Sequence, residues 1–114
     1  MGNKVVHFEI GCKDSPATQK FYTSLFDWEV SPMGPAAMIS TGEGGIGGHI
    51  SALGHEPHHY LTFYVEVDDL AAALKKAEEL GGKTVIPPQT IPTGSFAWFE
   101  DPAGNVVGLW KAAS

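Results

Sequence analysis

The clearest pattern in the chain is a run of β-forming residues that passes directly into an amphipathic helix. Residues 60–67 are rich in aromatic and β-branched side chains, which predicts a strand. Asp68 or Asp69 then offers a carboxylate to cap the free helix N–H groups, and Gly81-Gly82 ends the helix. The apolar residues in between fall on one helical stripe, formed by Leu70, Ala73, Leu74, Ala77 and Leu80.

The same order appears near the start of the chain. Val5 to Ile10 alternates and favours β structure, so it predicts a strand. Asp14-Ser15-Pro16 follows and has the composition of a helix start, with a capping side chain before a proline. Phe21, Leu25 and Phe26 then recur at helical spacing, one turn after Ala17.

Shorter strands complete each half of the chain. They are predicted at 29–32 and 35–40 in the first half, and at 84–86, 95–100 and 106–110 in the second. Pro87-Pro88 should end the strand before it, because proline has no N–H for the ladder. Residues 41–48 hold five glycines but lack the Lys-Ser/Thr of a phosphate loop, so a hairpin turn leading into a further strand is the better interpretation.

The two halves match at an offset of 55 residues. Five pairs carry the match: Phe8 with Phe63, Ile10 with Val65, Asp14 with Asp69, Leu25 with Leu80, and Val30 with Val85. We therefore predict a single α+β domain over residues 1–114, made of two βαβββ units at about 4–52 and 60–112. The polar stretch 52–59 marks the boundary. Two such units would form a strongly curved mixed sheet around a cleft, with the helices outside.

Charge and composition narrow the classes of function. The chain has 114 residues and a net charge of −6, and all seven of its basic residues are lysines. This argues against nucleic-acid binding and against a carboxylate or phosphate ligand held by a guanidinium group. No apolar run is long enough to span a membrane, and no export signal is visible. The single cysteine, Cys12, is typical of a reducing cytoplasm and is most simply a small buried hydrophobe.

Several motifs resemble the vicinal oxygen chelate superfamily, which includes glyoxalase I, the extradiol dioxygenases, and the bleomycin and fosfomycin resistance proteins. They are His7-Phe-Glu-Ile, Phe21-Tyr22, Leu25-Phe26-Asp27-Trp28, Val65-Glu-Val-Asp-Asp69, Ala77-Glu-Glu-Leu-Gly-Gly-Lys83 and Phe99-Glu-Asp-Pro-Ala-Gly-Asn105. Among its subgroups, glyoxalase-related proteins of unassigned activity match best. The resemblance implies a small molecule as ligand and a homodimer in which strands of both chains build each cleft.

The resemblance also implies where a metal ion would bind. Metal-dependent members take ligands from the first and last strands of each unit, and those positions here are His7, Thr62, Gly108, and either Gly48 or His49. Threonine is a poor metal ligand and glycine has no side-chain donor atom. At most two protein ligands therefore remain. We therefore expect no stoichiometric metal, although Zn²⁺ or Ni²⁺ could bind weakly to His7 with His49.

Other side chains are candidates for chemistry or ligand binding. Glu9 and Glu66 lie on the predicted first strands and would act as bases if they were buried, or be solvated edge residues if they were not. His7 and Thr62 would line the cleft. Tyr64 and Trp98 suit stacking on a planar ligand. His55, His58 and His59 form a metal cluster, supply a general base, or belong to an exposed linker.

Three functions stay open at this point. The first is a lyase or related enzyme of the glyoxalase class that acts on a small carbonyl compound through His7. The second is a metal-free module that sequesters a planar or cationic molecule, as in the bleomycin-resistance branch, which the acidic surface and the absence of arginine favour. The third is a scaffold or regulatory subunit without a small ligand.

Overall fold

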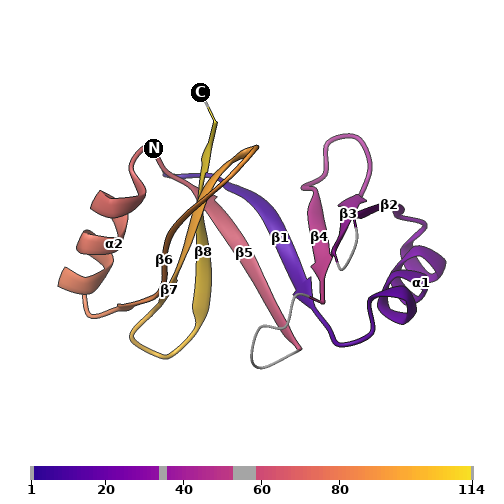
Figure 1. The fold of residues 1–114 in the computed structure, drawn as a ribbon, viewed down its shortest axis with the longest axis horizontal. Coiled ribbons are helices and arrows are strands. Elements are labelled where there is room, and N and C mark those ends of the chain that lie inside the picture. The colour runs from indigo at the N-terminus through magenta and orange to yellow at the C-terminus, as the bar shows by residue number, and fades with distance from the viewer. Residues whose placement is uncertain (1, 34–35, 53–58, 114) are drawn as a thin grey trace. The chain divides into compact units, whose positions relative to one another are not determined.

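The elements of the protein follow the order βαβββ twice (Figure 1). The computed structural model describes residues 2–33, 36–52 and 59–113. The first repeat comprises β1 (Val5–Gly11), α1 (Ser15–Phe26), β2 (Glu29–Met33), β3 (Ala36–Ser40) and β4 (Gly48–Ser51). The second comprises β5 (Tyr60–Glu66), α2 (Leu70–Glu79), β6 (Lys83–Ile91), β7 (Gly94–Glu100) and β8 (Val106–Ala112). The predicted α+β class and the tandem order are confirmed.

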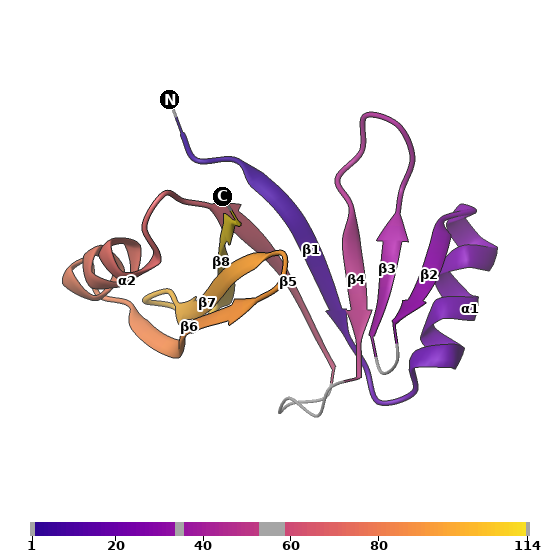
Figure 2. The ribbon, with the colours of Figure 1, turned by 45° about the horizontal axis from the view of Figure 1, so that its top comes forward.

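The chain forms two compact units, which are described separately. The N-terminal unit is His7–Thr62, and the C-terminal unit is Phe63–Ser114 together with Met1–Val6. In the N-terminal unit the strands lie in the order β2-β3-β4-β1, with β1 and β4 parallel and the other pairs antiparallel (Figure 2). Its core holds three buried isoleucines, and Phe8, Cys12, Tyr22, Trp28 and Val30 pack against Ile10, Ile39 and Ile50.

The C-terminal unit repeats this plan with a different core. Its strands lie in the order β5-β8-β7-β6, and β5 and β8 are parallel. Leu70 and Leu74 of α2 are buried against Ala97 and Leu109 of the sheet. The start of the predicted helical stripe, with Leu70, Ala73 and Leu74, is therefore the face that packs on the sheet, whereas Leu80 follows the helix and is 71% exposed.

Both helices begin at the predicted aspartates. The Ala17 N–H donates to Asp14 Oδ1 at 3.1 Å, and the Ala72 N–H donates to Asp69 Oδ1 at 3.0 Å, so Asp69 rather than Asp68 is the cap. After α2, Gly81 takes a left-handed backbone with φ of 102°. After α1 that conformation falls on Asp27, with φ of 60°, which costs a residue with a Cβ more than glycine.

One strand is longer than the sequence predicts. β6 continues through Pro87-Pro88 to Ile91, whereas the pattern indicated a break after Ile86. β6 lies at the edge of the sheet, where proline is tolerated, and Pro87 and Pro88 fall between the paired residues Ile86 and Gln89. Its register with β7 shifts between Thr84 and Ile86 and again between Ile86 and Gln89, which absorbs the prolines.

The glycine-rich residues form the turn between β3 and β4, as predicted. Gly42 and Gly44 have positive φ, and the Gly45 N–H donates to the Gly42 carbonyl at 3.1 Å. Across the residues that the structure describes, neither helix is both long and apolar enough to pass through a bilayer.

Candidate functional site

Four polar side chains of the N-terminal unit converge on the sheet face opposite its apolar core. His7 and Glu9 lie two apart on β1, and the register pairs Glu9 with His49 on the parallel strand β4. Tyr60, at the start of β5, reaches the same group. Because side chains alternate along a strand, Ile10 and its partner Ile50 point to the helix side instead. We call His7, Glu9, His49 and Tyr60 the polar cluster.

The polar cluster is a chain of close contacts. His7 Nε2 lies 2.6 Å from His49 Nδ1, and His49 Nε2 lies 3.3 Å from Glu9 Oε1. The Tyr60 hydroxyl donates to the other carboxylate oxygen, Oε2 of Glu9. Glu9 is only 2% exposed, so this carboxylate is buried among polar partners rather than solvated. His7 and His49 are partly exposed and form the accessible edge of the cluster.

A glycine makes room for the tyrosine. A Cβ at Gly11 would lie 2.0 Å from Tyr60 Cε2, so only glycine at this position lets the ring lie against β1 and reach Glu9. Ser51, paired with Gly11 in the register, is also buried, and its Oγ has no hydrogen-bond partner within the described part of the chain. It lies close enough to the phenol to affect its ionisation, but without hydrogen-bond geometry.

The surroundings favour the neutral forms of His7 and Tyr60. Burial, together with the neighbouring His49, lowers the pKa of His7 to about 4, against a smaller opposing effect of Glu9. Burial and the hydrogen bond to Glu9 raise the pKa of Tyr60 well above its usual range. At neutral pH His7 is therefore an uncharged imidazole and Tyr60 an un-ionised phenol.

Some predicted site residues lie where the pattern placed them, and others do not. The contact with His7 places His49 on the face of the polar cluster. A Cβ at Gly48 would instead lie 2.7 Å from the Phe8 ring, towards the core. The solvated interpretation of Glu9 is wrong, because two polar partners bury it. Glu66 is exposed at the end of β5. Sequence reasoning did not single out Tyr60 or Ser51.

The aromatic candidates of the C-terminal unit pair with each other. Trp98 Nε1 donates to the Tyr64 hydroxyl at 2.9 Å, and both side chains are buried. A Cβ at Gly108 would lie 2.3 Å from Tyr64 Cδ2, so the ring of Tyr64 occupies the space that a side chain at this position would need. Thr62, at the end of the N-terminal unit, is buried as well. Stacking of a ligand on Tyr64 or Trp98 stays a prediction.

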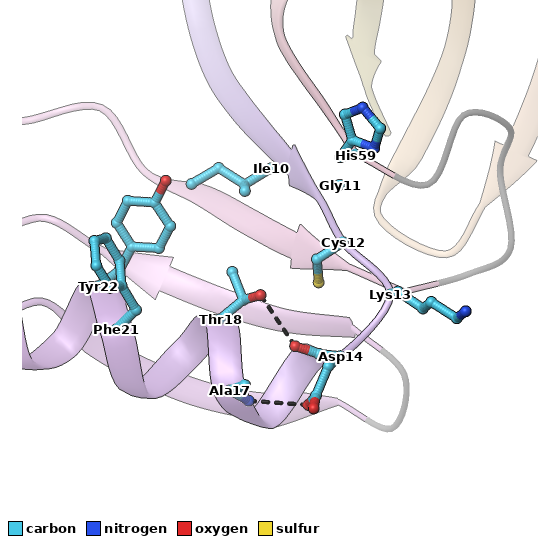
Figure 3. A pocket seen from close by; sticks show the side chains of 10 residues that line it. All are labelled: Ile10, Gly11, Cys12, Lys13, Asp14, Ala17, Thr18, Phe21, Tyr22 and His59. Atoms are coloured by element: carbon cyan, nitrogen blue, oxygen red, sulfur yellow. Dashed lines mark hydrogen bonds between the residues drawn. The ribbon is translucent and has the colours of Figure 1, made fainter.

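A separate open hollow lies where β1 meets α1 (Figure 3). Its volume is about 440 Å³, and its lining includes Cys12, Thr18, Tyr22 and His59. The Cys12 thiol donates to the Ser51 carbonyl at 3.6 Å, and the hydrogen bonds of Asp14 to α1 form one wall. His59 is exposed here, whereas His55 and His58 lie outside the described residues.

Comparison with known proteins now identifies the family. The model of the glyoxalase/bleomycin resistance protein/dioxygenase superfamily matches residues 4–109. The chain belongs to this superfamily.

Two curated relatives and one solved structure illustrate the range of the glyoxalase superfamily around this chain. "Putative glyoxylase CFP32" of Mycobacterium bovis is 31% identical over 87% of the chain and 42% of its own length. "Anthracycline biosynthesis protein DnrV" of Streptomyces peucetius is 28% identical over 91% of the chain and 45% of its own length. The chain thus spans somewhat under half the length of these relatives. The Mn(II)-bound glyoxalase from Novosphingobium aromaticivorans shares the fold, with a TM-score of 0.69 and 17% identity over 95% of this chain and 37% of that one.

The glyoxalase superfamily pattern implies a metal ion, but the donor set present does not fit one. Its four positions hold two imidazoles, one hydroxyl and Gly108, whose side-chain space the Tyr64 ring occupies. The facing nitrogens of His7 and His49 are 2.6 Å apart, whereas two nitrogens on one ion, each about 2.1 Å from it, lie about 3 Å apart or more. Within the described ranges, no group of three His, Cys, Asp or Glu side chains could hold a metal.

Proposed function

We propose that this chain is a metal-independent small-molecule-binding module of the glyoxalase/bleomycin resistance type, and that the polar cluster contacts the ligand. The observation that carries the proposal is the hydrogen-bonded chain from Tyr60 through Glu9 and His49 to His7. It fixes the orientation of two partly exposed imidazoles on rigid strands. Such preorganised polar groups on a sheet face set the orientation of a bound molecule.

The ionisation of the cluster favours binding over proton transfer. A general base works best when its pKa lies near the working pH. The pKa of His7, about 4, makes its imidazole a weak proton acceptor at pH 7. The raised pKa of Tyr60 likewise keeps its proton on the phenol. Neutral, oriented donors and acceptors suit hydrogen bonding to a ligand.

Charge and relatives suggest the class of ligand. The net charge of −6 and the absence of arginine favour a neutral or cationic molecule over an anion. The relative DnrV carries the name of anthracycline biosynthesis, and anthracyclines are planar polycyclic aromatics with hydroxyl and amino groups. We infer that the ligand is a planar aromatic molecule that carries such polar groups.

Titration of the purified chain with an anthracycline, followed by the fluorescence of the ligand, tests the proposal. We expect saturable binding that a chelator leaves unchanged. His7→Ala should weaken it at least about tenfold, the loss of roughly one hydrogen bond in a buried setting. His59→Ala is the matched control, because this histidine lines the separate hollow. Absence of saturable binding to a panel of planar aromatics would overturn the ligand class, and loss of binding in chelator would overturn metal independence.

A lyase of the glyoxalase class is the second candidate. It is supported by the relative named as a glyoxylase and by the Glu9–His49–His7 arrangement, in which a carboxylate orients one imidazole against another. Turnover of a methylglyoxal–thiol adduct that chelation abolishes would support this activity. No turnover in the presence of added Zn²⁺ or Ni²⁺ would count against it.

We further propose that the chain works as a homodimer in the cytoplasm. The alignments cover 42% and 45% of the two relatives, so each relative contains a further stretch at least as long as this chain. A second copy would supply an equivalent stretch. The single cysteine is consistent with a reducing compartment. Sedimentation at several concentrations tests the pairing, because the mass of one chain is 12.1 kDa.

A further inference from the structure

The polar cluster has a direction, because each of its contacts joins one hydrogen-bond donor to one acceptor. Glu9 fixes the direction at the buried end. An ionised carboxylate can only accept, and the Tyr60 hydroxyl donates to Oε2 while His49 Nε2 lies 3.3 Å from Oε1. In the contact between Glu9 and His49, the hydrogen therefore lies on His49 Nε2.

The state of His49 determines that of His7. An uncharged imidazole carries one hydrogen, so a ring with its hydrogen on Nε2 has a lone pair on Nδ1. His7 Nε2 lies 2.6 Å from His49 Nδ1 and has to supply the hydrogen between them, because two lone pairs would repel at this distance. With its pKa lowered to about 4, His7 is uncharged as well. Its single hydrogen is on Nε2, and its Nδ1 is an acceptor.

Rigid neighbours hold this arrangement in place. The register of the parallel strands β1 and β4 pairs Glu9 with His49. The ring centroids of His7 and His49 are 4.9 Å apart, with the ring planes tilted by 34°. Glu9 is 2% exposed, so water competes little for its oxygens, whereas His7 is partly exposed. The accessible end of the cluster is thus the end that accepts.

We propose that Glu9 determines specificity, by making the polar cluster select ligands that donate a hydrogen bond to His7 over ligands that only accept one. The inference rests on the proposed function and names the polar group of the ligand as a hydroxyl or an amino N–H. A carbonyl or ether oxygen brought to His7 Nδ1 would set two lone pairs against each other. Glu9 is a positioning residue, because it is buried and acts through His49 and His7.

A matched pair of ligands tests the selectivity. An aminoanthraquinone and its N,N-dimethyl derivative share the planar ring system and the carbonyl oxygens, and only the first has N–H groups. The titrations are made at about pH 8.5, where a histidine of ordinary pKa is uncharged. We expect the amino compound to bind at least about tenfold more tightly, the contribution of roughly one hydrogen bond. Equal affinities would overturn the inference and leave the proposed function standing, whereas binding of neither compound would overturn both.

Glu9→Gln separates the direction of the cluster from the greater bulk of the dimethyl compound. An amide can present either an oxygen or an N–H to His49, so the ratio of the two affinities should fall to within about threefold. Tyr60→Phe removes a hydrogen bond but leaves Glu9 as an acceptor, and the ratio should persist. Glu66→Gln, at the exposed end of β5, is the matched control and should also keep the ratio. An unchanged ratio in Glu9→Gln, with circular dichroism showing a folded chain, would overturn the role of Glu9.

Proton–nitrogen NMR correlations of the imidazole rings test the direction of the cluster without a ligand. In the unaltered chain we expect the hydrogen on Nε2 of both His7 and His49, because Glu9 accepts at the buried end. In Glu9→Gln we expect both tautomers. His7→Gln and His49→Gln assign the signals to their rings. A hydrogen on His7 Nδ1 in the unaltered chain would overturn the inference, whatever the ligand titrations show.

Discussion

In each unit a tyrosine ring packs against a strand glycine, but the hydroxyl groups of the two tyrosines have different hydrogen-bond partners. In the C-terminal unit Tyr64 lies against Gly108 and accepts a hydrogen bond from Trp98 Nε1, which joins two aromatic side chains. In the N-terminal unit Tyr60 lies against Gly11 and donates to the carboxylate of Glu9, which contacts His49. The same close approach of ring to glycine thus accompanies a tyrosine–tryptophan hydrogen bond in one unit and a chain of a carboxylate and two imidazoles in the other.

This contrast explains how one fold serves many chemistries. The glycine and the ring belong to the scaffold, because they fix where the hydroxyl lies. The partner of the hydroxyl, which is an indole of β7 in one unit and a carboxylate of β1 in the other, sets the chemistry. Function in such a fold therefore resides in a few side chains placed on a common frame.

Substitution of the two glycines that lie against tyrosine rings should have the largest effect on stability. Gly108→Ala should cost about 3 kcal/mol of unfolding free energy, because its Cβ meets a buried ring near the Tyr64 Cγ. Gly11→Ala should cost about 1–2 kcal/mol, since the partly exposed Tyr60 ring can move outward. Urea denaturation measures both. Equal losses of unfolding free energy in the two variants would show that both tyrosine rings are held equally rigidly.

Removal of the buried charge should be the next largest effect. Glu9→Gln keeps the shape of the side chain but removes the charge that faces Tyr60 and His49. We expect a loss of about 2 kcal/mol, the scale of hydrogen bonds to an ionised group. Glu66→Gln, on the exposed end of β5, is the control and should change the stability by less than about 0.5 kcal/mol. Stability that is unaffected by Glu9→Gln would contradict a cluster built around this carboxylate.

The pH dependence of stability should also distinguish the two units, because the polar cluster lies in the N-terminal unit. The pKa of His7 falls from 6.5 to about 4 in the folded chain. Between these values the unfolded chain binds a proton that the folded chain does not, so the stability is fully present above pH 6.5 and declines as the pH falls towards 4. Because the ring is partly solvated, we expect a decline of about 1–2 kcal/mol.

His7→Gln should flatten the stability profile between pH 6.5 and 4, the range set by the shift of His7. His59→Gln should leave the slope unchanged, because this histidine is exposed and outside the cluster. Thermal unfolding at half-unit pH steps measures both slopes. An unaltered slope in His7→Gln would show that another group controls acid stability.

The smallest effect is expected for the phenol of the N-terminal unit. Tyr60→Phe keeps the ring on Gly11 but removes one hydrogen bond, at a cost of about 1 kcal/mol. Because the pKa of Tyr60 is raised in the folded chain, its contribution is present below pH 10 and declines as the pH rises beyond that value. The variant should lack this alkaline decline, which absorbance at 295 nm and unfolding above pH 10 would reveal.

The fold was predictable from local signals that agree with each other. The match at 55 residues and the capping aspartates Asp14 and Asp69 required no tertiary information. The course of β6 was missed, because Pro87-Pro88 breaks only a strand that is paired on both sides. The exposure of Phe21 and Leu25, 59% and 58%, was not predictable, since spacing shows that the two share a face but not which way that face points.

The candidate site was only partly predictable. His7 and His49 could be placed by family position, and the register of β1 with β4 then brought them together. The burial of Glu9 depends on Tyr60, which is 51 residues away in sequence. One signal was available, namely Gly11 at the end of a strand, where a missing side chain indicates a close approach by another group. It did not say which group approaches.

The prolines at the sheet edges limit how copies of this chain can associate. Pro87-Pro88 in β6 and Pro32 in β2 each remove a donor from an edge strand. A foreign strand that aligned there would find gaps in its ladder, so open-ended growth into fibrils is disfavoured at both strands. The edge strands thus protect the chain from open-ended strand pairing even where it is abundant in a cell.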